Sequence, residues 1–236
     1  YLDLNEELFE LFGLFQGEGY KKTPVGGTRP GFVNSNEGII NFFLKMMEEK
    51  FQIQITQWSA FVNFVYSDNK QPEANDKLIN HWSKETGIPL TNFKRVNYLK
   101  GKGIRSAKWG VLHIFIPSCV LGEICLNTLN IMEDLSIKKK KYAAAFLRGL
   151  VAADGSVTLC QYKTIKSLSA VELALETEHE RILYSNVMKK LDLDVKDYSA
   201  SNRKLCVCGW DDFLKLALFD ILKLHEKKNE DFRKGF

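Results

Sequence analysis

Two short stretches of this chain follow one pattern: Leu11-Phe-Gly-Leu-Phe-Gln-Gly-Glu-Gly19 and Leu147-Arg-Gly-Leu-Val-Ala-Ala-Asp-Gly155. They align without a gap. Each has Leu, Gly and Leu at its first, third and fourth positions, an acid at the eighth and Gly at the ninth. A segment that recurs in this way indicates an internal duplication. We therefore expect a chain made of two related halves.

The residues around the two copies predict the same order of elements in each half. After the second copy we expect two strands, over 156–167 and 168–176, and then a helix opened by the capping box at Thr177 and Glu180. A hairpin over about 195–210 that turns at Ser201-Asn202 should follow, and then a last helix from Asp211 or Asp212. In the first half the matching strands are 20–22, 31–34, 52–66 and 110–116, with a helix capped by Ser35 or Asn36. This order predicts an α+β fold.

The first half is longer because it carries an insertion near residues 72–93. Pro72 suits the first turn of a helix there, and Gly87 suits the position just past its end. A strand over 94–99 follows. The predicted organisation is therefore a first half at 1–134, a linker at 135–141 and a second half at 142–236.

Composition excludes several classes of protein. The 236 residues are 45% hydrophobic and 26% charged, so a disordered or low-complexity chain is excluded, and the net charge of +4 is too mild to name a partner. Five cysteines without a CxxC pair predict a reduced, intracellular protein without a zinc site. The most apolar stretch, 111–129, contains His113, Pro117, Glu123 and Asn127, so we expect no membrane span. Residues 1–9 carry Asp3, Glu6 and Glu7, so we expect no signal peptide. Cytoplasm and organelle matrix are not distinguished.

Small residues recur at four-residue spacing before each acid of the repeat, at Gly13 and Gly17 and again at Ala145, Gly149 and Ala153. Such stripes let two helix backbones approach closely, so we expect Glu18 and Asp154 to lie side by side. Two carboxylates at helix C-termini repel each other unless cations are bound, and oxygen-only ligands favour Mg²⁺. One such motif alone is explained better by a Gly C-cap beside a solvated acid, whereas two matching copies favour a metal site that hydrolyses phosphodiesters.

The paired motifs and the order of elements resemble the LAGLIDADG homing endonucleases, specifically the monomeric kind with two motifs in one chain. The resemblance covers nearly the whole chain except the insertion. It implies two pseudo-symmetric αββαββα halves, with antiparallel sheets that form a DNA-binding saddle and motif helices packed at the central interface. The chain departs from the family motif in having Glu18 rather than Asp, Arg148 rather than Ala and Ala152 rather than Asp.

The resemblance also assigns roles to residues near the acids. It implies that Glu18 and Asp154 bind the catalytic metal, with the carbonyls of Gly17 and Ala153 as further ligands. The expected metal is Mg²⁺, with Ca²⁺ or Mn²⁺ as substitutes in binding. Lys21 is the candidate that activates water. Asn34 and Glu176 stand at matching strand ends, where family members keep a polar group near the cations, and a role as helix caps explains both residues equally well.

A basic stretch predicts contact with DNA. Residues 94–108 carry six positive charges and no acid, which is a phosphate-binding pattern: Lys94, Arg95, Lys100, Lys102, Arg105 and Lys108. Other basic residues fall on candidate strands or turns of the saddle: Lys22, Arg29, Lys163, Lys166, Arg203 and Lys204. The lysine run 138–141 is either a bridging phosphate contact or a soluble joint. The four histidines show no metal-ligand spacing and are expected to be surface or packed residues.

These observations favour a monomeric, Mg²⁺-dependent endonuclease that recognises a long site in double-stranded DNA and leaves 3′ overhangs, as the family does. A binding protein stays open as an alternative, either an RNA maturase that acts on an intron or a DNA-binding protein that does not cut. An intein endonuclease is disfavoured because no splicing block flanks the motifs. The sequence does not specify the target site or the host.

Overall fold

The computed structural model describes residues 2–20, 29–66, 74–101, 107–162 and 165–235. The chain divides into two compact units. The terminal unit consists of Tyr1–Gly17 with Asn127–Phe236, and the middle unit consists of Glu18–Leu126. Helix α4 (Cys119–Ser136) begins in the middle unit and ends in the terminal one. The halves 1–134 and 142–236 describe a repeat in the sequence, and they stay a prediction.

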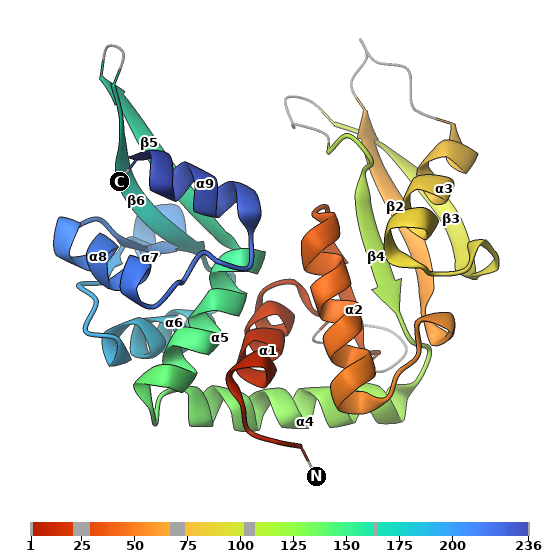
Figure 1. The fold of residues 1–236 in the computed structure, drawn as a ribbon, viewed down its shortest axis with the longest axis horizontal. Coiled ribbons are helices and arrows are strands. Elements are labelled where there is room, and N and C mark those ends of the chain that lie inside the picture. The colour runs from red at the N-terminus through yellow and green to blue at the C-terminus, as the bar shows by residue number, and fades with distance from the viewer. Residues whose placement is uncertain (1, 21–28, 67–73, 102–106, 163–164, 236) are drawn as a thin grey trace. The chain divides into compact units, whose positions relative to one another are not determined.

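The middle unit contains a four-stranded sheet in the order β1-β4-β2-β3 (Figure 1). Its strands are β1 (Gly31–Asn34), β2 (Ser59–Tyr66), β3 (Phe93–Lys100) and β4 (Val111–Phe115). Strand β4 pairs antiparallel with β1 and β2, but β3 runs parallel to β2. A parallel neighbour needs a crossover connection, and α3 (Asn75–Thr86) provides it. The expected insertion is thus a helix that returns the chain to the edge of the sheet, although its residues 72–73 lie outside the described ranges.

Helices α2 (Glu37–Phe51) and α3 cover the same face of this sheet. Phe43 of α2 stacks on Phe32 of β1 with ring centroids 4.3 Å apart. The hydroxyl of Tyr98 on β3 donates to Asn75 Oδ1 of α3 at 2.8 Å. Strand register places Phe32 and Tyr98 on one side, because alternate residues of paired strands share a face. The opposite side of the sheet is free of these two helices.

The ends of both helices follow the sequence signals. Asn36 caps α2 by accepting a hydrogen bond from the Ile39 N–H at 3.1 Å, as expected. Gly87 ends α3 in the left-handed conformation with φ of 76°. Two short 3₁₀ turns, Ile55–Gln57 and Leu90–Asn92, precede β2 and β3.

The terminal unit contains a second four-stranded sheet in the order β5-β6-β8-β7. The strands, all antiparallel to their neighbours, are β5 (Gly155–Tyr162), β6 (Ile165–Ala174), β7 (Lys196–Asp197) and β8 (Lys204–Val207). Its helices are α1 (Glu6–Glu18, whose last residue falls in the middle unit), α5 (Lys140–Ala153), α6 (Glu178–Lys190), α7 (Ser199–Asn202), α8 (Trp210–Leu218) and α9 (Glu226–Gly235). The predicted α+β class with two sheets is confirmed.

Two boundaries in this unit differ from the expected ones. Strand β5 ends at Tyr162 and β6 begins at Ile165, and these two residues are paired, so the strands do not divide between 167 and 168 as expected. The expected last helix stops at Leu218, and Asp220 adopts the left-handed conformation with φ of 50°. This break allows a further helix, α9, that the sequence did not predict.

Helices α1 and α5 approach as closely as their backbones allow. A Cβ placed on Gly13 would lie 2.2 Å from the Phe146 carbonyl oxygen. A Cβ placed on Gly149 would lie 2.2 Å from the Glu10 carbonyl oxygen. Both distances are far inside van der Waals contact, so only glycine fits at either position. The predicted packing of small residues between the motif helices is present for this part of α1 and α5.

A buried ion cluster joins the same two helices. Arg148 Nε donates to Glu10 Oε1 at 2.6 Å, and the same oxygen lies 2.8 Å from Lys223 Nζ. The guanidinium also pairs with Glu6 and donates to the Phe219 carbonyl at 3.0 Å. Removing one partner of a buried pair is costly because it leaves the other charge uncompensated. Arg148, a departure from the family motif, thus links α5 to α1 and to the end of α8.

We expect Gly149→Ala to lower the free energy of unfolding by about 3 kcal/mol, because the new methyl group overlaps the backbone of α1. Urea unfolding followed by circular dichroism measures this change.

Gly38→Ala in α2 is the matched control, because a Cβ there meets only the Asn36 side-chain oxygen, at 3.3 Å. Its unfolding free energy should stay within about 1 kcal/mol of the parent. Equal stabilities of the two variants would contradict the close approach.

Candidate functional site

The second motif ends where a helix turns directly into a strand. Helix α5 ends at Ala153, and the Asp154 N–H still bonds the Leu150 carbonyl at 2.9 Å. Gly155 begins β5, and a Cβ on it would lie 2.6 Å from the Val151 carbonyl oxygen. Only glycine therefore allows this turn. The result is a carboxylate held at the C-terminal end of a helix, at the head of a strand.

The end of the first motif helix lies against this carboxylate. A Cβ on Gly17 would lie 2.5 Å from the Ala153 Cβ and 3.1 Å from Asp154 Oδ2. The structure thus brings Gly17, Ala153 and Asp154 together within the terminal unit. Glu18 is the next residue of the chain and the last of α1.

Lys228 of α9 contacts the same helix end, and no pattern in the sequence predicted this contact. Its ammonium donates to the carbonyls of Val151 and Ala152 at 2.8 Å each and to that of Ala153 at 3.3 Å. These carbonyls belong to the last turn of α5, where the helix dipole is negative and intrahelical donors are lacking. Ala153, a predicted metal ligand, therefore already has a cationic partner. Adjacent Lys227 looks the same in the sequence, so only the three-dimensional packing identifies Lys228.

The two polar residues at the strand ends lie next to the N-caps of the helices that follow, Asn36 for α2 and Thr177 for α6. Asn34 is buried, and its Oδ1 accepts a hydrogen bond from the Asn36 N–H at 2.8 Å. The N–H of Glu176 donates to Glu180 Oε2 at 2.7 Å, within the predicted capping box of α6. Glu176 also lines a polar pocket of about 210 Å³ together with Arg203. The Asn34 side chain thus bonds the backbone of the residue that caps α2, and its role near the cations stays a prediction.

Several predicted residues lie where their side chains are not described. Lys21, Lys22, Lys102, Arg105 and Lys163 fall outside the described ranges. Lys166 belongs to β6, but its side chain is likewise undescribed.

The side of the middle-unit sheet opposite α2 and α3, here called the open face, carries Phe61, Asn63, Arg95, Asn97 and His113. The Arg95 guanidinium lies over the Phe61 ring, 5.5 Å from its centroid. Phe61 in turn stacks on His113, with centroids 4.4 Å apart. Of these residues, only Arg95 was predicted as a DNA contact. The others escaped notice because the sequence signal was charge, and they carry none at neutral pH.

The other described basic residues that were predicted to contact DNA differ in their surroundings within each unit. Lys100 lies two residues after Tyr98 on β3 and so shares its helix-covered side. Exposed Lys94 lies beside the irregularity in β2–β3 pairing. Lys108 lies over the Trp109 ring, at 4.8 Å. Lys204 pairs with Glu172 at 2.7 Å. Arg29 is exposed and Arg203 adopts φ of 49° at the end of α7.

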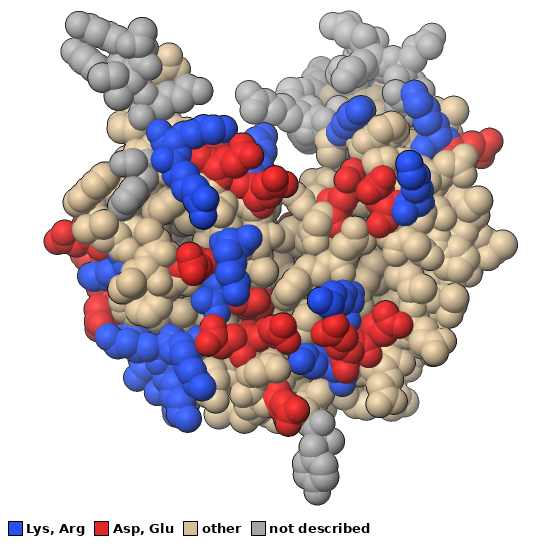
Figure 2. Space-filling model, viewed as in Figure 1, with Lys and Arg blue, Asp and Glu red and all other residues tan. Residues whose placement is uncertain are grey.

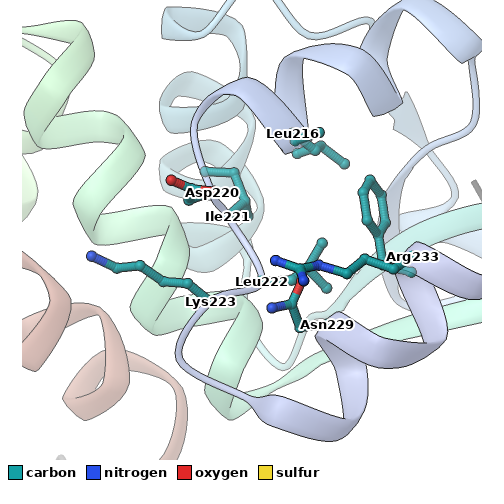
Figure 3. Close-up of a pocket in the computed structure, with 9 residues that line it drawn as sticks. Leu216, Asp220, Ile221, Leu222, Lys223, Asn229 and Arg233 are labelled. Carbon is teal, nitrogen blue, oxygen red and sulfur yellow. The ribbon is translucent and has the colours of Figure 1, made fainter.

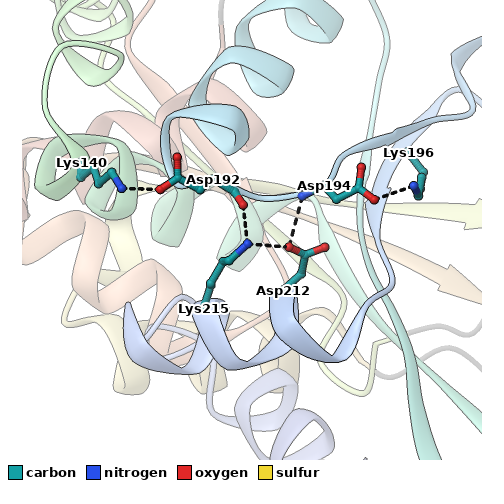
Figure 4. A network of polar contacts seen from close by, with 6 residues as sticks. All are labelled: Lys140, Asp192, Asp194, Lys196, Asp212 and Lys215. Carbon is teal, nitrogen blue, oxygen red and sulfur yellow. Dashed lines mark hydrogen bonds and ion pairs between the residues drawn. The ribbon is translucent and has the colours of Figure 1, made fainter.

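Figure 2 shows Lys and Arg interspersed with Asp and Glu over most of the viewed face, with one basic gathering near the start of α5. The run 138–141 flanks the start of α5, which is Lys140. Lys140 pairs with Asp192, whose backbone carbonyl binds Lys215, and Lys215 reaches Asp212 at 3.3 Å (Figure 4). The hydrogen bond from Lys140 holds the pKa of Asp192 below its usual value. This lysine is therefore part of an ion network within the fold.

A separate pocket of about 150 Å³ lies between α8 and α9 (Figure 3). Leu216, Ile221, Leu222 and Phe232 form its apolar lining, and Lys223 at its edge is paired with Glu10. No predicted site residue lines it.

No group of three or more His, Cys, Asp or Glu side chains within the described ranges is arranged to hold a metal ion. No helix among the described residues has the length and apolar character needed to cross a membrane.

No family model matches the chain, and no curated protein matches it in sequence. Among solved structures, the N-terminal LAGLIDADG domain of DUF199/WhiA superposes with a TM-score of 0.51 over 97% of this chain and 86% of that chain, at 14% identity. This chain has the LAGLIDADG fold. Full-length DUF199/WhiA from Thermatoga maritima matches equally well, with a TM-score of 0.51 at 14% identity, and this chain spans 59% of its length. I-DmoI in complex with DNA and Mn matches with a TM-score of 0.47 at 13% identity, over 92% of this chain and 97% of that one.

The expected resemblance is thus confirmed at the level of fold. In this LAGLIDADG fold, α1 and α5 are the motif helices, and each acid of the repeat stands at the end of its helix. Sequence identity this low leaves the activity to be argued from the residues themselves.

We expect Lys228→Met to lower the free energy of unfolding by about 1–3 kcal/mol, because three carbonyls lose a charged donor. Lys227→Met is the matched control, since no described residue pairs with Lys227, and it should leave stability unchanged. Thermal and urea unfolding measure both variants. A Lys228 variant as stable as the Lys227 variant would contradict the capping role.

Stability should also fall with acidification. Burial lowers the pKa of His113 from 6.5 to about 4, and burial followed by the nearby Lys228 charge lowers that of His225 to about 4. Between about pH 6.5 and pH 4 the unfolded chain binds protons that the folded chain does not, so the free energy of unfolding decreases as pH falls.

The double variant His113→Gln, His225→Gln should lose less stability over that pH range than the parent. Urea unfolding at several pH values measures the difference. Parallel curves for the two proteins would show that these histidines do not titrate in this way.

Proposed function

We propose that this chain is a sequence-specific, metal-dependent endonuclease that cuts double-stranded DNA and leaves 3′ overhangs. The observation that carries the proposal is the position of Gly17, whose missing side chain leaves room for Ala153 and Asp154. This contact sets the end of one motif helix against the acid of the other motif. Among functions considered for this fold, metal-dependent phosphodiester hydrolysis uses such paired acids most directly.

The carboxylates of Glu18 and Asp154 are the proposed ligands of Mg²⁺, with the Gly17 carbonyl as a further oxygen. Hard oxygen donors of this kind suit Mg²⁺, and Ca²⁺ or Mn²⁺ would substitute in binding. The Ala153 carbonyl is the weaker candidate, because the Lys228 ammonium already lies 3.3 Å from it. The donors therefore fit a divalent cation without histidine or cysteine.

When bound, the metal lowers the pKa of an attacking water and offsets charge that develops on the phosphate. The chain itself supplies position and fixed charge. Asp154 is held by the α5–β5 junction, and Lys228 places a positive charge at the same helix end. Lys21 is the proposed group that activates water.

Double-stranded DNA is the proposed partner, bound by a monomer. The open face offers Arg95 beside neutral hydrogen-bonding groups, which suits contact with both phosphates and base edges. The remaining basic residues named from the sequence are proposed as phosphate contacts, except Lys100, Lys108 and Lys204, whose surroundings favour structural roles.

One observation favours a second candidate, a DNA-binding protein on this scaffold that does not cut. Lys228 supplies a permanent positive charge at the end of α5, so this helix end is stabilised without a bound cation. Such a protein would bind DNA equally well in the presence and absence of divalent metal.

The decisive test is the double variant Glu18→Gln, Asp154→Asn. Cleavage of a DNA pool with randomised sites in Mg²⁺ should fall about a thousandfold, since several kcal/mol of charge stabilisation are lost. Binding to the same pool should persist, because both substitutions keep the side-chain shape.

Glu49→Gln on the exposed side of α2 is the matched control and should cleave like the parent. Cleavage that survives in the double variant would overturn the metal assignment. A parent protein that binds selected sites but never cuts them would favour the second candidate.

A further inference from the structure

A chain of hydrogen bonds crosses the open face from Tyr20 to Asn97. Tyr20 Oη lies 2.7 Å from His113 Nδ1, and His113 Nε2 lies 2.7 Å from Asn63 Nδ2. Asn97 Nδ2 then donates to Asn63 Oδ1 at 2.8 Å. All four residues belong to the middle unit. We propose that this series of hydrogen bonds orients the Asn97 amide to recognise adenine in the major groove. The inference rests on the proposed DNA-binding function.

With the amide nitrogens and oxygens of Asn63 and Asn97 placed as they are, the donors and acceptors of these hydrogen bonds have one consistent order. An amide nitrogen only donates, so His113 Nε2 must accept from Asn63. The proton of the neutral imidazole is then on Nδ1, which donates to Tyr20 Oη. Since the Asn63 nitrogen faces His113, its oxygen faces Asn97 and accepts there. Asn97 is therefore held with its amide nitrogen toward Asn63.

The anchor of the chain is packed on several sides. The His113 ring stacks on Phe61, and the Tyr20 ring covers Gly31, where a Cβ would lie 2.5 Å from Tyr20 Cδ2. Burial keeps His113 neutral near pH 7, as the order of donors requires. Tyr20, His113 and Asn63 are positioning residues, because Asn63 uses both ends of its amide within the chain.

Asn97 is the member of the chain with groups left to offer. One of its two N–H groups binds Asn63, which leaves the second N–H and the carbonyl oxygen. No described residue binds these groups, and the side chain is half exposed. Adenine presents N7 as an acceptor next to the N6 donor in the major groove, and one asparagine amide matches both. Guanine presents two acceptors there, so its O6 would oppose the asparagine oxygen.

A fixed amide matters because a freely rotating one can exchange its oxygen and nitrogen. Rotation would let Asn97 approach other bases with either atom and would weaken discrimination. The bond to Asn63 removes this freedom before DNA binds. The entropy lost in ordering the Asn97 side chain therefore belongs to folding and not to DNA binding. We expect adenine to be preferred about tenfold to a hundredfold at one position of the target.

The test is selection of bound duplexes from a randomised pool in Ca²⁺, for the parent and for Asn97→Ala and Asn97→Asp. The parent should select adenine at one position. Asn97→Ala should lose the preference there while keeping the rest of the selected sequence. Asn97→Asp, which only accepts hydrogen bonds, should shift the same position toward cytosine, whose N4 donates.

Two further variants separate positioning from folding. His113→Phe keeps the stacking on Phe61 but removes the link to Asn63, so it should relax the adenine position with little change in binding to unselected DNA. Asn80→Ala on the exposed side of α3 is the matched control and should select the parental sequence.

Each outcome bears on the inference. A parent that selects a sequence that Asn97→Ala and Asn97→Asp leave unchanged at every position would overturn the role of Asn97 and leave the proposed function standing. A parent that binds no DNA would overturn both. Thermal unfolding of each variant checks that a changed preference does not come from a damaged fold.

Discussion

The contact between the backbones of α1 and α5 is the constraint on which the rest of the terminal unit depends. Gly13 and Gly149 allow each helix to touch the carbonyl oxygens of the other. At this separation there is no room for a side chain, so the direction of both helices is fixed. With the helices in that direction, Gly17 lies against Asp154. The buried Glu10–Arg148 pair stabilises this packing of α1 on α5. A metal site that depends on two acids needs this precision, because small displacements change how carboxylates share a cation.

Local patterns in the sequence were enough to predict the motif helices, most strands and the caps at Asn36, Thr177 and Gly87. These features depend on residues a few positions apart, so propensity and periodicity report them. Lys228 and the chain from Tyr20 to Asn97 could not be predicted in this way. Their partners lie 75 and 93 positions away, and nothing local distinguishes them from other lysines or histidines. The parallel pairing of β3 likewise depends on where α3 packs.

Charge alone does not define the proposed nucleic-acid surface. A run of lysines and arginines marks a segment, but strand alternation sends its members to opposite faces, as with Arg95 and Lys100 on β3. Some of the basic side chains also form ion pairs within the fold, such as Lys204 with Glu172. Among its described residues, the open face carries Arg95 beside neutral donors and acceptors. Such a surface suits discrimination between bases more than bulk attraction to phosphate.

The division of the chain has a consequence for synthesis on the ribosome. Helix α1 is apolar over most of its surface, with Leu8, Phe9, Leu11, Phe12, Leu14 and Phe15 all buried, yet its partner α5 begins only at Lys140. At typical elongation rates α1 therefore leaves the ribosome about ten seconds before α5. During that interval the nascent chain exposes a strongly apolar segment while the middle unit emerges. The order of the elements thus sets how long this apolar helix stays without its partner during synthesis.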